Sequence, residues 1–61
     1  MYKEEALDYI RKKSRELWGR SPSFELVWMK LLDTLPNGIR LLRHHGKLSD
    51  DEIEREVRAS Q

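Results

Sequence analysis

Two adjacent histidines and a run of three acidic residues are the side chains of this sequence that could most readily do chemistry. The histidines are His44 and His45, and the acidic run is Asp50, Asp51 and Glu52. A helical pair of metal ligands needs a spacing of three or four residues, whereas neighbouring positions on a helix diverge by about 100°. A zinc site also needs three or four ligands in a tetrahedral array. We therefore expect no metal site.

The acidic run is better explained as the start of a helix. Ser49 and Glu52 have the S-x-x-E spacing of a capping box, and acidic groups in a first turn favour the positive end of the helix dipole. The run lacks the D-x-D-x-D-G spacing of a calcium loop, and no glycine-rich phosphate loop is present. A chain of 61 residues can hardly enclose a substrate pocket. We expect neither enzyme activity nor a cofactor.

The length of the sequence allows a single small helical domain, residues 1–61, that must be held together by packing. Cysteine is absent, which excludes disulfides and fits an intracellular or an engineered protein equally. No apolar run approaches the roughly 20 residues that span a bilayer. The acidic, amphipathic first segment is unlike a secretory signal. We expect a soluble protein with no membrane partner, but its location stays unknown.

Charge is distributed unevenly along the chain. Residues 1–47 carry ten Lys and Arg against six Asp and Glu, a net charge of +4, and residues 48–61 carry two against five, a net charge of −3. We expect the acidic tail to pack near the basic part and to help fold it. A basic face for an acidic partner is the alternative.

Helical spacing, glycines and prolines predict an all-α fold without strands. The fold expected is a compact bundle of four helices, two longer and two short, around a central second helix. Gly19 should stop the first helix in the left-handed conformation, and Gly46 should end the third. The fourth helix has a thin apolar stripe, so we expect it to dock weakly. The predicted helices cover residues 2–19, about 21 or 23 to 34, 36–45 and 50–59.

The start of the second helix has two candidate caps. Ser21 would place Pro22 in the first turn, where its missing N–H costs nothing, and Ser23 is the other candidate. Pro36 cannot donate to the preceding turn and biases Leu35 away from helix, so the second helix should end before it.

The most apolar segment, Ser23 to Leu35, raises the main question about function. On a helical wheel six of its apolar residues fall within an arc of about 140°, which suits a buried face. Leu26 and Met29 point to the opposite side, among charged residues. Either the bundle wraps this helix almost completely, or Leu26 and Met29 form an exposed patch with Trp18 and Leu41. The six residues of the arc are Phe24, Val27, Trp28, Leu31, Leu32 and Leu35.

Phe24, Trp28 and Leu31 also have the spacing F-x-x-x-W-x-x-L. This spacing resembles the helix in the transactivation segment of a tumour suppressor that inserts three side chains into a groove of a ubiquitin ligase. The resemblance covers eight residues and would imply docking into such a groove. Because the same three residues face the predicted core, we expect them to be used in packing.

We therefore expect a non-catalytic protein-binding module, either a natural adaptor or regulator or an engineered mini-protein. Its partner would be another protein chain, including a second copy of itself, bound through Leu26, Met29, Trp18 and Leu41. The alternative is a small DNA- or RNA-binding helical domain that uses basic residues of the first and third helices. Those basic residues are Arg11, Lys12, Arg15, Arg40, Arg43 and Lys47.

Overall fold

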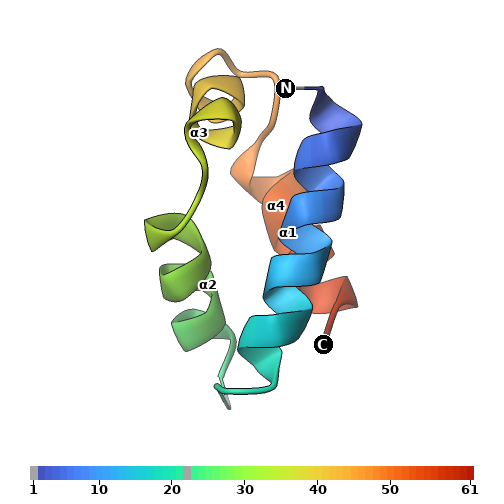
Figure 1. The fold of residues 1–61 in the computed structure, drawn as a ribbon, viewed down its shortest axis with the longest axis vertical. Helices are drawn as coiled ribbons and strands as arrows, with labels where there is room; N and C mark the ends of the chain where they lie inside the picture. Colours follow the sequence, from blue (N-terminus) through green and yellow to red (C-terminus); the bar gives the residue numbers. More distant parts are fainter. Residues whose placement is uncertain (1, 22) are drawn as a thin grey trace.

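The computed structural model describes residues 2–21 and 23–61, which form four helices (Figure 1). No strand occurs in these ranges, so the predicted all-α bundle is confirmed. α4 has ten residues, as α2 does, and only α3 is shorter, with eight. The first-turn role predicted for Pro22 lies outside the described residues. The helices are α1 (Lys3–Trp18), α2 (Phe24–Asp33), α3 (Asn37–His44) and α4 (Asp50–Ala59).

α1 is the helix against which each of the others packs. α2 runs back alongside α1, α3 lies across the end that holds the N-terminus, and α4 packs against α1 and α2 (Figure 1). We expected α2 to be central, and α2 packs against α1 and α4 and is hydrogen-bonded to α3 through Arg40. α1 is the longest helix, with 16 residues, and it too packs against each of the others.

The inner face of α1 repeats at the helical period. Ala6, Ile10, Ser14 and Leu17 are its buried residues, and they recur at helical spacing. The small side chains of Ala6 and Ser14 leave room for neighbouring helices to come close. The Ser14 hydroxyl is fully enclosed and has no hydrogen-bond partner among the described residues.

α4 begins at the capping box that the sequence predicts. The Ser49 side chain accepts a hydrogen bond from the Glu52 N–H, and the Glu52 carboxylate accepts one from the Ser49 N–H, each at 3.2 Å. The expectation of weak docking was wrong. Ile53 and Val57 are fully buried, and the Trp18 indole N–H donates to the Val57 carbonyl at 2.8 Å. The stripe is thin, but α1 and α2 both pack against α4.

The two glycine breaks differ in conformation. Gly46 has φ 72° and ends α3 as predicted, with the Lys47 N–H donating to the Leu42 carbonyl at 2.9 Å and the Gly46 N–H to the Arg43 carbonyl at 3.1 Å. Gly19 does not take the left-handed conformation that we expected, because its φ is −66°. The chain leaves α1 in a further right-handed turn, closed by the Arg20 N–H on the Leu17 carbonyl at 3.0 Å.

Ion pairs join the basic part of the chain to its acidic tail. Lys3 pairs with Glu52, Arg11 contacts Glu56 at 3.2 Å, and Arg43 contacts Asp50 at 2.8 Å. The prediction that the tail packs near the basic part is confirmed. Each such pair is partly exposed and adds little stability alone, and together they link α4 to α1 and α3.

The burial of α2 predicts a sharp contrast between two substitutions. Leu31→Ala removes a fully buried side chain and should lower the free energy of unfolding by about 2–5 kcal/mol. Met29→Ala changes an exposed position and should stay within about 0.5 kcal/mol of the parent. Urea denaturation followed by circular dichroism measures both, and equal effects would contradict this orientation of α2.

The Lys3–Glu52 contact predicts a pH dependence. The Lys3 ammonium and the Ser49 N–H hold the pKa of Glu52 below its ordinary value. A lowered folded-state pKa gives stability that is present above the ordinary pKa of about 4.3 and is lost as pH falls through the lowered value. Lys3→Met should raise the pKa of Glu52 and make the stability lost in acid smaller.

Carboxyl NMR titration of Glu52 and urea denaturation between about pH 2 and 7 measure these two effects. The matched control is Lys12→Met, because Lys12 pairs with Asp8 at 3.0 Å and not with Glu52. A Glu52 titration that is the same in the parent and in Lys3→Met would contradict the contact.

Candidate protein-interaction surface

α2 buries a narrower arc than its sequence predicts. Val27 and Leu31 are fully buried, and Leu35 is nearly so. Phe24, Trp28 and Leu32 belong to the same predicted arc, but they are half-buried against the edge of the core. The side of α2 that turns inward is therefore centred near Leu31. The opposite side is correspondingly more exposed.

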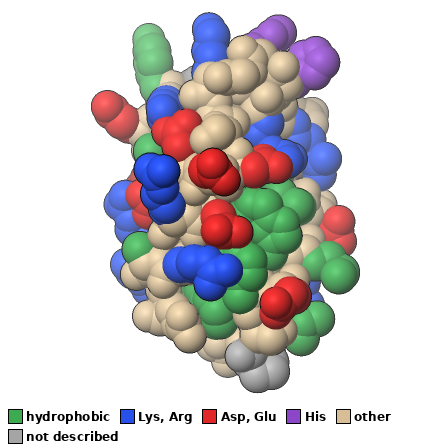
Figure 2. All heavy atoms as spheres, turned by 180° about the vertical axis from the view of Figure 1, so that it is seen from behind, with side chains coloured by type: hydrophobic (Ala, Val, Ile, Leu, Met, Phe, Trp, Pro, Cys, Tyr) green, Lys and Arg blue, Asp and Glu red, His purple; other side chains and the backbone are tan. Residues whose placement is uncertain are grey.

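That opposite side carries Leu26 and Met29, which are 42% and 58% exposed. We call the surface formed by these two residues, with the neighbouring Glu25, Lys30 and Asp33, the outer face of α2. All three charged residues are exposed as well. Figure 2 shows hydrophobic side chains standing out from the α2 side of the molecule with acidic groups beside them. The other helices thus leave this side of α2 exposed to solvent.

Hydrogen bonds hold both ends of α2. Ser23, and not Ser21, is the N-cap, and its hydroxyl accepts from the Leu26 N–H at 3.4 Å. At the other end, the Arg40 guanidinium of α3 donates to the Leu35 carbonyl at 2.9 Å and to the carbonyls of Leu32 and Asp33 at 3.3 Å each. These carbonyls would otherwise lack partners at the helix end. The outer face is therefore presented on a fixed helix.

The other two residues predicted for the patch lie elsewhere. Trp18 packs against the core and donates its indole N–H to α4, so it is committed to the contact between α1 and α4. Leu41 is 56% exposed, but it belongs to α3, which packs mainly against α1. Of the four predicted residues, the structure places only Leu26 and Met29 together, three residues apart on one helix.

The basic residues predicted for nucleic-acid binding are mostly engaged within the domain. Arg11 contacts Glu56, which raises the pKa of Arg11, and Lys12 contacts Asp8. Arg43 contacts Asp50, and Arg40 caps α2. Among the described residues, Arg15 and Lys47 take part in no ion pair. They stand on α1 and after α3, and two separate cations do not make a phosphate-binding stripe.

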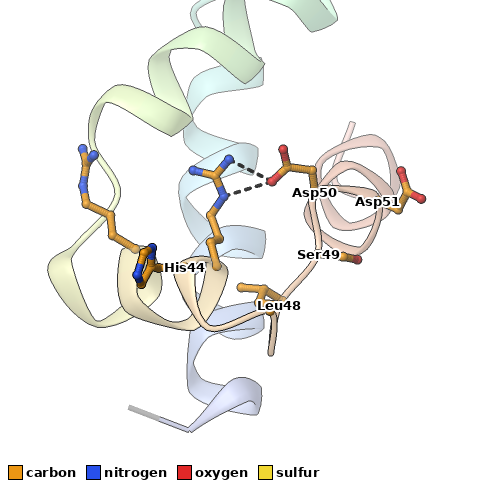
Figure 3. Close-up of a pocket in the computed structure, with 8 residues that line it drawn as sticks. His44, Leu48, Ser49, Asp50 and Asp51 are labelled. Atoms are coloured by element: carbon orange, nitrogen blue, oxygen red, sulfur yellow. Dashed lines mark hydrogen bonds and ion pairs between the residues drawn. The ribbon is translucent and has the colours of Figure 1, made fainter.

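A hollow lies between α3 and the start of α4. Arg43 contacts Asp50 there at 2.8 Å. Figure 3 shows Asp51 pointing away on the far side of α4. The N-terminus of a helix and an arginine side chain both attract anions. Here the Glu52 carboxylate already caps the start of α4, and the Asp50 carboxylate already pairs with Arg43. The hollow is open to solvent, and the positive charges of Arg40 and Arg43 in its lining are balanced by the negative charges of Asp50 and Asp51.

The two histidines are exposed at the end of α3, with their ring centroids 5.3 Å apart. Among the described residues, no group of three acidic or histidine side chains could hold a metal ion. No helix in the described part of the chain has the length and apolar character needed to cross a membrane.

Sequence reasoning missed an apolar ridge next to the outer face. Phe24 and Trp28 stack with ring centroids 5.8 Å apart, and the Arg58 guanidinium of α4 lies 4.0 Å from the centre of the Phe24 ring. Figure 2 shows hydrophobic surface in the middle of this view of the molecule. The one hint of this ridge in the sequence is that Trp28 and Leu32 lie toward one edge of the predicted apolar arc. Leu31 is buried, so the F-x-x-x-W-x-x-L residues do not share one exposed surface.

Comparison of the chain with protein-family models, curated proteins and solved structures found no match.

The Arg40 contact predicts a stability effect that depends on the shape of the guanidinium. Arg40→Met should lower the free energy of unfolding by about 1–2 kcal/mol, because three carbonyls lose a charged donor. Arg40→Lys should recover little, since a single ammonium cannot reach all three.

Urea denaturation measures the effect of each Arg40 variant. The control is Arg15→Met, an exposed cation of α1, which should change stability by less than about 0.5 kcal/mol. Full stability of Arg40→Met would mean that α2 is not capped from α3.

Proposed function

We propose that this domain is a non-catalytic protein-binding module that uses the outer face of α2. The observation that carries the proposal is the joint exposure of Leu26 and Met29 on a helix whose other side is buried. Apolar anchors on one helical face, held at helical spacing, are how a fixed helix docks with a partner. The caps at both ends support this, because a helix already ordered loses little entropy on binding.

Nucleic acid is the weaker candidate. Its binding would draw mainly on phosphate contacts by Lys and Arg. Four of the six basic residues considered for it already contact carboxylates or carbonyls within the domain. Using them would first require those contacts to break.

The proposal predicts that the outer face selects helical partners. A displayed library of amphipathic helical peptides should yield ligands for the parent protein. The double variant Leu26→Lys/Met29→Glu should keep its fold, because both positions are exposed. It should bind these ligands about 30-fold more weakly, since central apolar anchors carry most of an interface's energy.

The matched control is Arg15→Glu, a charge change on α1 away from the outer face, which should leave peptide affinity unchanged. Equal affinity of the parent and the double variant would contradict the proposal. A labelled duplex that binds the parent with steep salt dependence, and that is unaffected by the double variant, would favour nucleic acid instead.

A further inference from the structure

The charged side chains of α2 stand apart from those of the other helices. Ion pairs within the described residues use charged groups of α1, α3 and α4. Glu25, Lys30 and Asp33 of α2 take part in none of them. All three are exposed, and they surround Leu26 and Met29. α2 therefore combines a partly exposed apolar face with charged side chains that form no ion pair within the described residues.

We propose that the outer face of α2 binds a second copy of this chain, with the two α2 helices parallel about a twofold axis. This inference rests on the proposed function and names its partner. On a helical wheel, Glu25 and Lys30 lie about 70° to either side of the line midway between Leu26 and Met29. In heptad terms Leu26 and Met29 occupy positions a and d, Glu25 occupies g, and Lys30 occupies e.

This pattern gives charge complementarity in one orientation only. When the twofold axis runs parallel to the helices, each flank of one helix faces the opposite flank of the other. Glu25 then faces the partner's Lys30, and the same contact occurs a second time by symmetry. The residues are offset by about 7.5 Å along the axis, which their long side chains can bridge. In an antiparallel pair each flank would face its own copy, and like charges would meet.

The residues of the outer face of α2 also determine how strong the contact between the two copies is. Asp33 lies seven residues after Leu26, so it would meet the partner's Asp33 where a second apolar layer would otherwise stand. The contact is thus confined to one heptad and buries much less than the ~800 Å² per partner of a stable interface. We expect a weak, reversible dimer that forms at high local concentration.

Sedimentation equilibrium of the full chain at low salt, from about 10 µM to about 1 mM, tests this inference. The parent should shift from monomer to dimer, and Leu26→Lys/Met29→Glu should stay monomeric. Glu25→Lys alone and Lys30→Glu alone should each weaken association roughly tenfold, because two attractive contacts become repulsive. The double reversal Glu25→Lys/Lys30→Glu should restore the association of the parent. Circular dichroism checks that each variant keeps the helical fold.

Several outcomes would overturn the inference. They are a parent that stays monomeric over the whole range, single reversals that leave the association constant unchanged, or a double reversal that fails to rescue. A monomeric parent that still binds helical peptides through Leu26 and Met29 overturns self-association alone and leaves the proposed function standing. A charge-dependent dimer that binds no peptide supports self-association and overturns the broader peptide-binding function.

Discussion

Burial of the inner face of α1 is the interaction on which the rest of the structure depends. Ile10 and Leu17 provide the bulk, and Ala6 and Ser14 provide the space in which neighbouring helices can approach. α2, α3 and α4 all pack against this helix. A domain of 61 residues has few apolar side chains to bury, so the loss of one such contact removes a large share of what holds the helices together.

The parts of the fold that local chemistry decides could be predicted from the sequence. The S-x-x-E pattern at Ser49 placed the start of α4 at the observed residue, and Gly46 ends α3 in the conformation that suits glycine. These signals work because a cap or a left-handed turn is settled by a few neighbouring residues. The exposure of Leu26 and Met29 could not be predicted. A helical wheel shows on which side of the helix a residue lies, but not whether another helix covers that side.

The parts that depend on packing between distant residues could not be read in advance. Whether Trp28 is buried or half-buried depends on how closely α4 approaches α2. No local sequence pattern predicts that distance. Arg40 looked like a candidate for phosphate contact, yet its guanidinium serves the carbonyls at the end of α2. α4 looked weakly docked because a thin stripe says nothing of the partner that covers it.

The contact between α1 and α4 joins residues that are far apart along the chain, with Lys3 meeting Glu52. During synthesis, α1 emerges first and stays without its main partner until α4 has been made. The part of the inner face of α1 that α4 covers therefore stays exposed during that interval. The entropy cost of joining two distant segments rises only slowly with the length of the loop between them. The core of this domain is thus closed only when its last helix is available: α1, the first of the four helices to be made, is completed by α4.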